Sequence, residues 1–246
     1  MQLVSVIIPY HKKKNFIKET INSIKNQTYK NLEIIIIYDD EDYSDLEYIE
    51  KIRKSDRRIK LIVNKKILGA GKSRNLGIKK AKGTYLAFLD ADDLWKKNKI
   101  QSQLSYMYQN KFDVSHTTYE ILKKNQKYKK LMQARTFKNY QELLPSCDIG
   151  LSTVILKRRV ITKKCKFSEL KTKEDFVLWL LILKKNIPIG GYDKNLMTWR
   201  KLDNSLSSSI IQKFKDGFRV YNEYMKFNFL KSIFYLLILS VNFLKK

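Results

Sequence analysis

Residues 31–40 read NLEIIIIYDD, a run of apolar residues that ends in two aspartates. Four consecutive isoleucines are apolar on both sides of an extended chain, which is typical of a buried parallel strand with helices on both faces. A second apolar run, Val4–Pro9, precedes it, and Ile17, Ile21 and Ile24 recur between the two runs at helical spacing. These segments predict two parallel strands joined by a helix.

The alternation of strands and helices continues along the chain. The pattern predicts a helix with Leu46, Ile49 and Ile52 on one side, a strand at Ile59–Val63, a helix at Lys72–Ala81 and a strand at Thr84–Leu89. Regular alternation of this kind indicates an α/β fold with a doubly wound, mostly parallel sheet, in which ligands bind at the carboxyl ends of the strands. Polar residues stand at those ends, namely Pro9-Tyr10-His11, Asp39–Asp42 and Asp90–Asp93.

The second part of the chain has a looser pattern. It predicts a helix containing Ile100, Leu104 and Met107, strands at Asp113–Tyr119 and Leu151–Leu156, a solvated loop at Lys123–Lys130, an apolar helix at Glu174–Lys185, and a strand pair around Gly190-Gly191 within Ile187–Arg200. We therefore expect one domain at residues 1–208, with a nucleotide-binding half at 1–93 and an acceptor and catalytic half at 94–208. Residues 209–246 are expected to form a helical extension.

The extension contains a strongly apolar segment, Phe227–Leu244, followed by Lys245-Lys246. Its uncharged core is shorter than the roughly 20 residues that span a bilayer. Aromatic residues and flanking lysines favour a segment that lies on a membrane surface, with packing on the domain as the alternative.

Charge is the most unusual property of the whole chain. The 246 residues include 50 Lys+Arg and 24 Asp+Glu, which gives a net charge of +26. Such a charge attracts polyanions, although a biased base composition of the genome explains dispersed lysines equally well. No recognition motif or aromatic stacking platform supports nucleic-acid binding.

The two cysteines indicate a reducing compartment. Cys147 and Cys165 match no zinc spacing and are interpreted as structural cysteines, and no export signal is recognised.

The stretch FLDADDLW at 88–95 concentrates three carboxylates directly after a predicted strand. Asp90 and Asp92 supply the oxygen ligands that Mg²⁺ and Mn²⁺ prefer, and such an ion usually completes its shell with phosphate and water. This chemistry suits a nucleoside diphosphate leaving group. Asp93 is predicted to cap a helix that begins at Leu94.

A competing interpretation comes from Gly69-Ala70-Gly71-Lys72-Ser73, which looks like the end of a phosphate-binding loop of an ATPase. That loop needs a glycine five positions before Gly71, and Lys66 stands there. The segment also follows the third predicted strand instead of the first. We keep an ATPase, and a basic nucleic-acid-binding protein, only as alternatives.

Three segments together resemble the family 2 glycosyltransferases with a GT-A fold. They are VSVIIPYHKKKNFIKETINSIKNQTYKNLEIIIIYDD at 4–40, GAGKSRNLGIKKAKGTYLAFLDADDLW at 69–95 and KTKEDFVLWL at 171–180, in the order and spacing of that family, and the resemblance extends over about residues 3–208. It implies a nucleotide-sugar donor, most simply linked to UDP, a divalent metal, Mn²⁺ or Mg²⁺, and inversion at the anomeric carbon.

The resemblance also implies which residues bind the donor. They are Pro9, Tyr10, Asp39, Asp40, Arg74, Asn75, Asp90, Ala91, Asp92 and Arg200, of which Asp90 and Asp92 would face the metal. Either Asp39 or Asp40 would accept the N–H of the base, because Tyr38 shifts the register of the acidic pair. His11 replaces a common asparagine and is expected to be solvated. Arg200 would contact the phosphates beside a segment, Asn204–Ser207, that closes over the donor.

By the same resemblance Asp175 is the catalytic base, and Glu174 and Trp179 support the acceptor side of the site. A positioned base contributes about 10²–10⁴ in rate. The implied reaction is sugar transfer to a hydroxyl of a cell-surface glycan precursor. The positive charge and apolar tail suggest a lipid-linked acceptor and a cytoplasmic enzyme at the inner face of the cell membrane.

Overall fold

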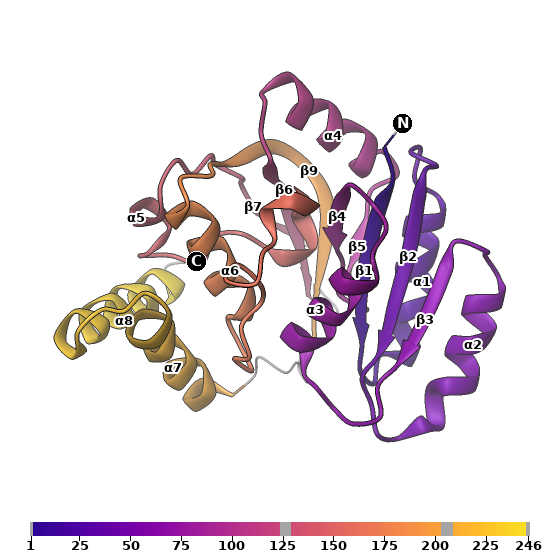
Figure 1. The fold of residues 1–246 in the computed structure, drawn as a ribbon, viewed down its shortest axis with the longest axis horizontal. Coiled ribbons are helices and arrows are strands. Elements are labelled where there is room, and N and C mark those ends of the chain that lie inside the picture. The colour runs from indigo at the N-terminus through magenta and orange to yellow at the C-terminus, as the bar shows by residue number, and fades with distance from the viewer. Residues whose placement is uncertain (1, 124–128, 203–208, 245–246) are drawn as a thin grey trace.

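The computed structural model describes residues 2–123, 129–202 and 209–244 (Figure 1). Its strands are β1 (Val4–Tyr10), β2 (Leu32–Tyr38), β3 (Ile59–Val63), β4 (Tyr85–Phe88), β5 (Leu94–Trp95), β6 (Val114–Lys123), β7 (Lys129–Met132), β8 (Ile155–Lys157) and β9 (Ile189–Lys201). Its α-helices are α1 (Lys14–Lys25), α2 (Leu46–Lys54), α3 (Ala70–Lys80), α4 (Lys99–Gln109), α5 (Tyr140–Leu143), α6 (Glu174–Lys184), α7 (Ile210–Arg219) and α8 (Phe229–Leu244).

One mixed sheet organises these elements in the order β3-β2-β1-β4-β8-β6-β9-β5, with β7 added beside β6. The strands β1 to β4 are parallel, as are β6 and β9, whereas β8 is antiparallel to both of its neighbours. The predicted parallel strands of the first half are therefore confirmed, whereas β5 and β7 are antiparallel to β9 and β6, so the whole sheet is mixed. Every element predicted before residue 90 exists, with ends that differ by at most a few residues.

The isoleucine run of β2 is buried on both faces, as predicted. Ile34 and Ile36 belong to a core with α1 and α2, whereas Ile35 and Ile37 belong to a second core with α3 and α6. Because successive side chains of a strand point to opposite faces, an unbroken apolar run is what a sheet covered on both sides requires. Figure 1 shows α1 and α3 on opposite sides of β1 and β2.

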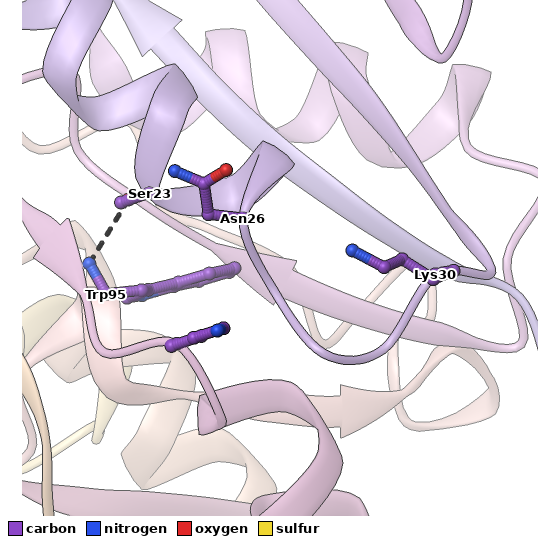
Figure 2. Close-up of a pocket in the computed structure, with 5 residues that line it drawn as sticks. Ser23, Asn26, Lys30 and Trp95 are labelled. Carbon is purple, nitrogen blue, oxygen red and sulfur yellow. Dashed lines mark hydrogen bonds between the residues drawn. The ribbon is translucent and has the colours of Figure 1, made fainter.

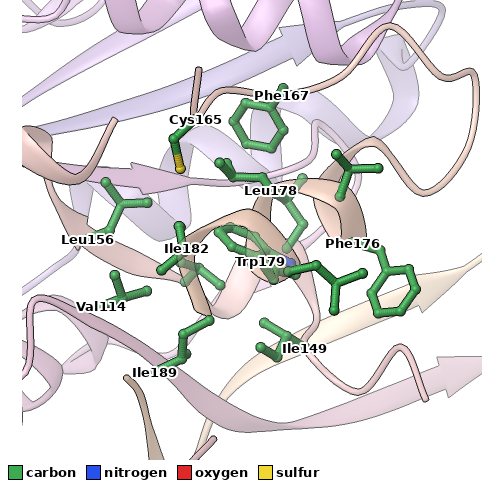
Figure 3. Packing of buried hydrophobic residues seen from close by; sticks show 14 of the residues in the cluster. Val114, Ile149, Leu156, Cys165, Phe167, Phe176, Leu178, Trp179, Ile182 and Ile189 are labelled. Atoms are coloured by element: carbon green, nitrogen blue, oxygen red, sulfur yellow. The ribbon is translucent and has the colours of Figure 1, made fainter. Parts of the chain in front are cut away.

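The second core surrounds α6, whose residues Phe176 to Leu180 are all buried. A helix that is apolar all round must lie inside the protein. Figure 3 shows Trp179 among side chains from several elements, including Val114 of β6 and Ile189 of β9. Cys165 lies in this core and Cys147 packs against it, which agrees with structural roles for both.

The predicted strand pair around Gly190-Gly191 is wrong, because both glycines lie inside the single long strand β9. A Cβ atom at Gly191 would lie 2.2 Å from the backbone carbon of Arg135, and one at Gly190 would lie 2.4 Å from the ring of Phe112. The glycines therefore permit close packing instead of a turn.

Two further predictions need correction. Within the predicted strand Leu151–Leu156, Leu151–Thr153 forms a 3₁₀ turn and the strand β8 begins at Ile155. Of the predicted loop Lys123–Lys130, the first residue ends β6 and the last two belong to β7, so the pairing of two strands overrides the lysine-rich composition there. The remainder of that segment, 124–128, is outside the described residues.

The C-terminal helical extension is present and packs against the domain. A π-helical segment, Val220–Tyr224, follows α7 and leads toward α8, and its buried Tyr221 donates its hydroxyl to the carbonyl of Leu144 at 2.6 Å. Figure 1 shows α7 and α8 at the opposite end of the molecule from α2 and β3. Among residues 2–123, 129–202 and 209–244, no helix is long and apolar enough to cross a membrane.

The strand register brings the predicted polar clusters together. Tyr10 pairs with Tyr38 at the ends of β1 and β2, and Ile7 pairs with Phe88 at the end of β4. Because the three strands are parallel, the residues that follow them leave the sheet at one edge.

Candidate active site

The acidic loop at residues 90–93 is fixed by a buried serine. Ser152 Oγ accepts the backbone N–H of Asp90 at 3.1 Å and donates to Asp93 Oδ2 at 2.6 Å. The backbone N–H of Arg200 donates to the other oxygen of Asp93 at 3.2 Å. Asp93 is buried, and burial followed by the charges of Asp90 and Asp92 raises its pKa well above the usual value. Its predicted role as a helix cap is wrong, because Leu94 begins the strand β5 and not a helix.

Asp92 is paired with a lysine from the start of α1. Lys13 Nζ lies 2.8 Å from Asp92 Oδ2, and both side chains are largely buried. Burial and the charge of Asp90 raise the pKa of Asp92, while Lys13 opposes that rise. Lys13 could not be singled out from the sequence, because it is one of three adjacent lysines and its partner is distant in the chain.

Arg74 of α3 bridges the acidic loop to the start of α6. Its guanidinium donates to Asp90 Oδ1 at 2.7 Å and to Glu174 Oε1 at 2.6 Å, and it lies 5.4 Å from the ring centre of Phe167. Burial lowers the pKa of Arg74, but the two carboxylates outweigh burial and raise it. Only 4% of the side chain is exposed, and direct contact of Arg74 with a donor stays a prediction.

Asp175 lies beside this bridge in the first turn of α6 and is half-buried. Its Oδ1 accepts the N–H of Phe176 at 2.7 Å. Burial and the charge of Glu174 raise the pKa of Asp175 to about 7, although the charge of Arg74 and the bond from Phe176 oppose this. A carboxylate that titrates near neutral pH is suited to accept a proton.

The two aspartates after β2 have different surroundings. Asp39 accepts hydrogen bonds from Asn64 Nδ2, from the N–H of Leu68 and from the N–H of Gly69, each at 2.8 Å. It thereby fixes the loop that leads into α3, where Gly69 has a φ of 85°. Asp40 accepts one backbone bond, from Asp42 at 3.1 Å.

His11 is not simply solvated, contrary to expectation. Its Nδ1 lies 2.9 Å from the carbonyl oxygen of Asp39 and 3.7 Å from Asp40 Oδ2. The turn after β1 thus packs onto the acidic pair. Pro9 is partly buried.

The side chain of Tyr10, which is expected to line the donor site, is fully buried. Its hydroxyl donates to Asp45 Oδ2 at 2.7 Å, and its ring stacks on Tyr38 at 5.3 Å. Burial, followed by the hydrogen bond to Asp45, raises the pKa of Tyr10. The side chain is therefore part of the core below the strand ends.

Three other expected donor residues are engaged with the protein. Asn75 exchanges hydrogen bonds with the backbone of Phe167, at 2.9 Å and 3.1 Å, and Ala91 is buried with its carbonyl bonded to Thr20 Oγ1 at 3.0 Å. Arg200 directs its guanidinium at the carbonyl of Asp92, at Glu19 and at Thr20. These contacts hold the acidic loop against α1, and the expected phosphate contact of Arg200 stays a prediction. Asn204–Ser207 lies outside the described residues.

The side chain of Trp179, which is expected to support the acceptor side of the site, is completely buried. Its ring meets Phe167 edge to face at 6.2 Å, and Phe167 in turn packs on Arg74. It therefore supports the site through the core.

A cleft of about 580 Å³ lies on another part of the surface, and its lining residues are drawn in Figure 2. Its lining residues are Ser23, Asn26, Lys30, Trp95 and Lys97. The backbone N–H of Trp95 donates to Ser23 Oγ at 3.2 Å within it. None of the lining residues belongs to the acidic loop or to the start of α6, so the cleft is separate from the candidate site.

The donor atoms present fit a divalent metal that is completed by its substrate. Asp90 and Asp92 are close enough for the charge of one to raise the pKa of the other, and Lys13 already supplies a cation to Asp92. Within the described part of the chain, no group of three or more His, Cys, Asp or Glu side chains forms a closed metal site. Two carboxylates leave positions for phosphate oxygens and water, which is how Mg²⁺ and Mn²⁺ are commonly held with nucleotides.

The profile of the family described as glycosyl transferase family 2 matches residues 5–165. The chain belongs to glycosyl transferase family 2. Two relatives of this family member illustrate the range of matches. "UDP-Glc:alpha-D-GlcNAc-diphosphoundecaprenol beta-1,3-glucosyltransferase WfgD" of Escherichia coli is 35% identical over 246 residues, which cover 99% of this chain and 94% of the relative. An "Uncharacterized glycosyltransferase" of Rickettsia felis is 40% identical over 195 residues, or 78% of this chain, but the match spans only 32% of that longer relative.

Solved structures show that this family 2 member has the GT-A fold. S. aureus TarS 1–349 in complex with UDP-GlcNAc superimposes with a TM-score of 0.75 at 21% identity, covering 96% of this chain and 70% of that chain. The mannosyltransferase PcManGT from Pyrobaculum calidifontis, in complex with GDP-Man and Mn²⁺, superimposes with a TM-score of 0.71 at 13% identity. The match covers 95% of this chain and 69% of that chain. The predicted family and fold are confirmed, and the ATPase and nucleic-acid alternatives lose their basis.

Proposed function

We propose that the chain transfers a sugar, with inversion, from a UDP-linked donor to a hydroxyl of a lipid-linked glycan precursor. The observation that carries the proposal is the position of Asp175. It is a half-buried carboxylate with a pKa of about 7, linked through Glu174 and Arg74 to the acidic loop at Asp90. A proton acceptor and a diphosphate-binding loop are the two parts that such a transfer requires.

In this proposal residues 1–93 bind the donor and residues 94–208 bind the acceptor. Asp40 is the better candidate for the base contact, because Asp39 already accepts three hydrogen bonds from its own chain. The partly buried Pro9 would lie below the nucleoside at the end of β1. Support for UDP comes from the donor named for the E. coli relative.

Asp90 and Asp92 would hold Mn²⁺ or Mg²⁺, and the bound ion would neutralise charge on the departing diphosphate. The Mn²⁺ named in the PcManGT complex supports this choice of ion. Lys13, which now pairs with Asp92, is a second positive group at the same place.

The chemical step follows from these positions. Asp175 accepts the proton of the acceptor hydroxyl as the oxygen attacks the anomeric carbon from the face opposite the diphosphate. The new carbon–oxygen bond forms, the bond to the UDP oxygen breaks, and the electron pair leaves with UDP. The Arg74 bridge keeps Asp175 at a fixed distance from the acidic loop, because both Asp90 and Glu174 bind the same guanidinium. Such positioning lowers the entropic part of the barrier.

The acceptor assignment rests on the name of the E. coli relative, which includes a sugar linked to diphosphoundecaprenol. An acceptor of this kind is anchored in a bilayer. We accordingly place the enzyme in the cytoplasm, at the inner face of the cell membrane, and the net charge of +26 is suited to that anionic surface.

A donor screen tests the proposal. UDP or GDP release would be measured over a panel of nucleotide sugars with Mn²⁺ and a GlcNAc-diphospho-lipid acceptor present, and release from one UDP-sugar is expected. Asp92→Ala should lose release while its thermal unfolding stays close to that of the wild type. Lys97→Ala, in the separate cleft, is the control that should retain release. Full release by Asp92→Ala would contradict the role given to the acidic loop.

A further inference from the structure

The helices α7 and α8 have an inner side that is bound to the domain. On α8 this side carries Ser232, Tyr235, Leu239 and Asn242, of which Ser232 and Leu239 are buried. Tyr235 stacks on Tyr221 at 5.5 Å, and Asn242 Nδ2 donates to the carbonyl of Pro145 at 2.9 Å. These contacts fix which side of α8 faces outward.

The outer side of α8 carries a continuous apolar stripe at Leu230, Phe234, Leu237, Val241 and Leu244. The spacing alternates between four and three residues, so the five side chains lie along one face of the helix. Their exposed fractions range from 49% at Val241 to 82% at Leu244. An exposed stripe of this kind, on a helix whose other side is already packed, marks an interaction surface.

Other apolar residues extend this surface. Sixteen large apolar side chains are exposed in the described part of the chain, and ten of them lie in α7 and α8. Five of the ten form the stripe, and the other five are Ile210, Ile211, Phe214, Phe229 and Phe243. The two helices are in contact, with the ring of Phe218 5.6 Å from that of Phe229. We call the exposed residues of α7 and α8 the docking face.

The charges around the docking face are mostly positive. Lys215, Lys226 and Lys231 are exposed, and Lys213 Nζ lies 5.3 Å from the ring centre of Phe243. Of the two acids in the same segment, Asp216 is buried and Glu223 is paired with Arg219 at 2.8 Å. Burial, together with repulsion from Lys173 and Lys201, lowers the pKa of Lys213, which indicates uncompensated positive charge between this face and α6.

We propose that the docking face binds the surface of an anionic phospholipid bilayer, with the apolar stripe inserted among the acyl chains and the lysines at the headgroups. Apolar area combined with lysines is the combination that holds an amphipathic helix at such a surface. A second copy of the chain is the other possible occupant of a stripe at this spacing. It is disfavoured because each copy carries a charge of +26.

Two hydrogen bonds connect α7, which carries part of the docking face, to the segment before the proposed base. Asp216 of α7 accepts the N–H and the hydroxyl of Thr172 through Oδ2, at 2.9 Å and 3.0 Å. Thr172 lies three residues before Asp175, so docking would hold the proposed base near the membrane surface. This last step rests on the proposed function, whereas membrane docking does not.

The test is cosedimentation of the full chain with vesicles of phosphatidylglycerol and phosphatidylcholine in equal parts, compared with vesicles of phosphatidylcholine alone. The wild type should bind the anionic vesicles more tightly, and added salt should weaken binding. Leu230→Ser with Phe234→Ser and Leu237→Ser should weaken binding on the order of a hundredfold. Tyr108→Ser with Ile67→Ser removes exposed apolar side chains elsewhere and should leave binding unchanged.

A second variant guards against misfolding of the first. Lys213→Gln with Lys231→Gln keeps the apolar stripe and should weaken binding to anionic vesicles about tenfold, with no change on neutral ones. A wild type that stays in the supernatant with anionic vesicles would overturn the proposal. So would a dimer in light scattering that the triple serine variant converts to a monomer.

Failure of the docking proposal can be told apart from failure of the proposed function. UDP release is measured on the same samples without vesicles. Release with no vesicle binding overturns docking alone, and vesicle binding with no release from any UDP-sugar overturns the proposed function alone.

Discussion

Replacing Asp175 by Asn should stabilise the protein and abolish transfer at the same time. The pKa of Asp175 is about 7 in the folded chain, against an ordinary value of 3.8. Three pH units correspond to about 4 kcal/mol, so ionised Asp175 lowers the free energy of unfolding by at most about that amount. Asparagine has nearly the same shape, keeps an oxygen for the N–H of Phe176 and cannot ionise.

The sign of the effect follows from linkage. A carboxyl group with a raised pKa contributes stability that is fully present below its unfolded value, here 3.8, and is lost as the pH rises through about 7. The free energy of unfolding of the variant should therefore exceed that of the wild type by up to about 4 kcal/mol at pH 8 and by less than about 2 kcal/mol at pH 5. Urea unfolding at the two pH values measures both differences.

The same ionisation should raise the activity of the wild type as the pH rises, whereas it lowers the stability. Only ionised Asp175 accepts a proton, so kcat of the wild type should fall about tenfold for each pH unit below 7. The asparagine variant should lose about 10²–10⁴ in rate while binding of UDP stays almost unchanged. Titration calorimetry with UDP and Mn²⁺ gives the binding control.

Glu174→Gln is the matched control, because it removes a charge from the adjacent residue. It leaves Arg74 with one carboxylate fewer and should destabilise the chain by about 3–5 kcal/mol. Because the charge of Glu174 raises the pKa of Asp175, the acid limb of the rate profile should move to lower pH. Transfer within tenfold of the wild type by Asp175→Asn would refute the base assignment. Lost transfer with no gain in stability at pH 8 would refute the effect of burial.

Four more outcomes are expected. Arg74→Met leaves two carboxylates without their shared partner and should lower the free energy of unfolding, measured in urea, by about 3–5 kcal/mol. A decrease below about 1 kcal/mol would show that the bridge between Asp90 and Glu174 does not stabilise the fold. Asp216→Ala removes the hydrogen-bond acceptor of Thr172 and should lower the free energy of unfolding by about 1–3 kcal/mol. It should also lower kcat more than it changes KM. An unchanged kcat would show that α7 does not influence the site. EDTA should stop UDP release, and added Mn²⁺ should restore it. Lys13→Met should strengthen Mn²⁺ binding, measured by electron paramagnetic resonance, because Asp92 loses the ammonium group that competes with the metal. Unchanged Mn²⁺ binding would mean that Lys13 moves aside at no cost.

The sequence was most informative where local pattern alone determines structure. The isoleucines of β2 and the helical spacing in α1 predicted both elements, because each face of the sheet needs an unbroken apolar cover. The same reasoning placed the acidic residues at the strand ends. It failed at Gly190-Gly191, since a glycine pair is compatible with a turn or with a close backbone approach, and only the position of Arg135 decides between them.

The partners of the site residues could not be predicted in the same way. Lys13 and Asp92, or Arg74 and Glu174, are distant in sequence and meet only because of the fold. Ser152, which holds both Asp90 and Asp93, lies in a 3₁₀ turn that the pattern represented as part of a strand. Resemblance to a family names residue types at positions, but it does not say whether a side chain such as Arg200 faces a ligand or its own chain.

The two adjacent acids at the start of α6 show why that distinction matters for chemistry. Glu174 accepts a hydrogen bond from Arg74, so its charge is compensated, whereas Asp175 receives, from the residues that the structure describes, only the N–H of Phe176. Asp175 also experiences the charge of Glu174, and that repulsion adds to burial in raising its pKa. A group that is to remove a proton near neutral pH must not be held in its ionised form by a strong cation. Because Arg74 binds Glu174, Asp175 remains the acid whose proton affinity suits the reaction.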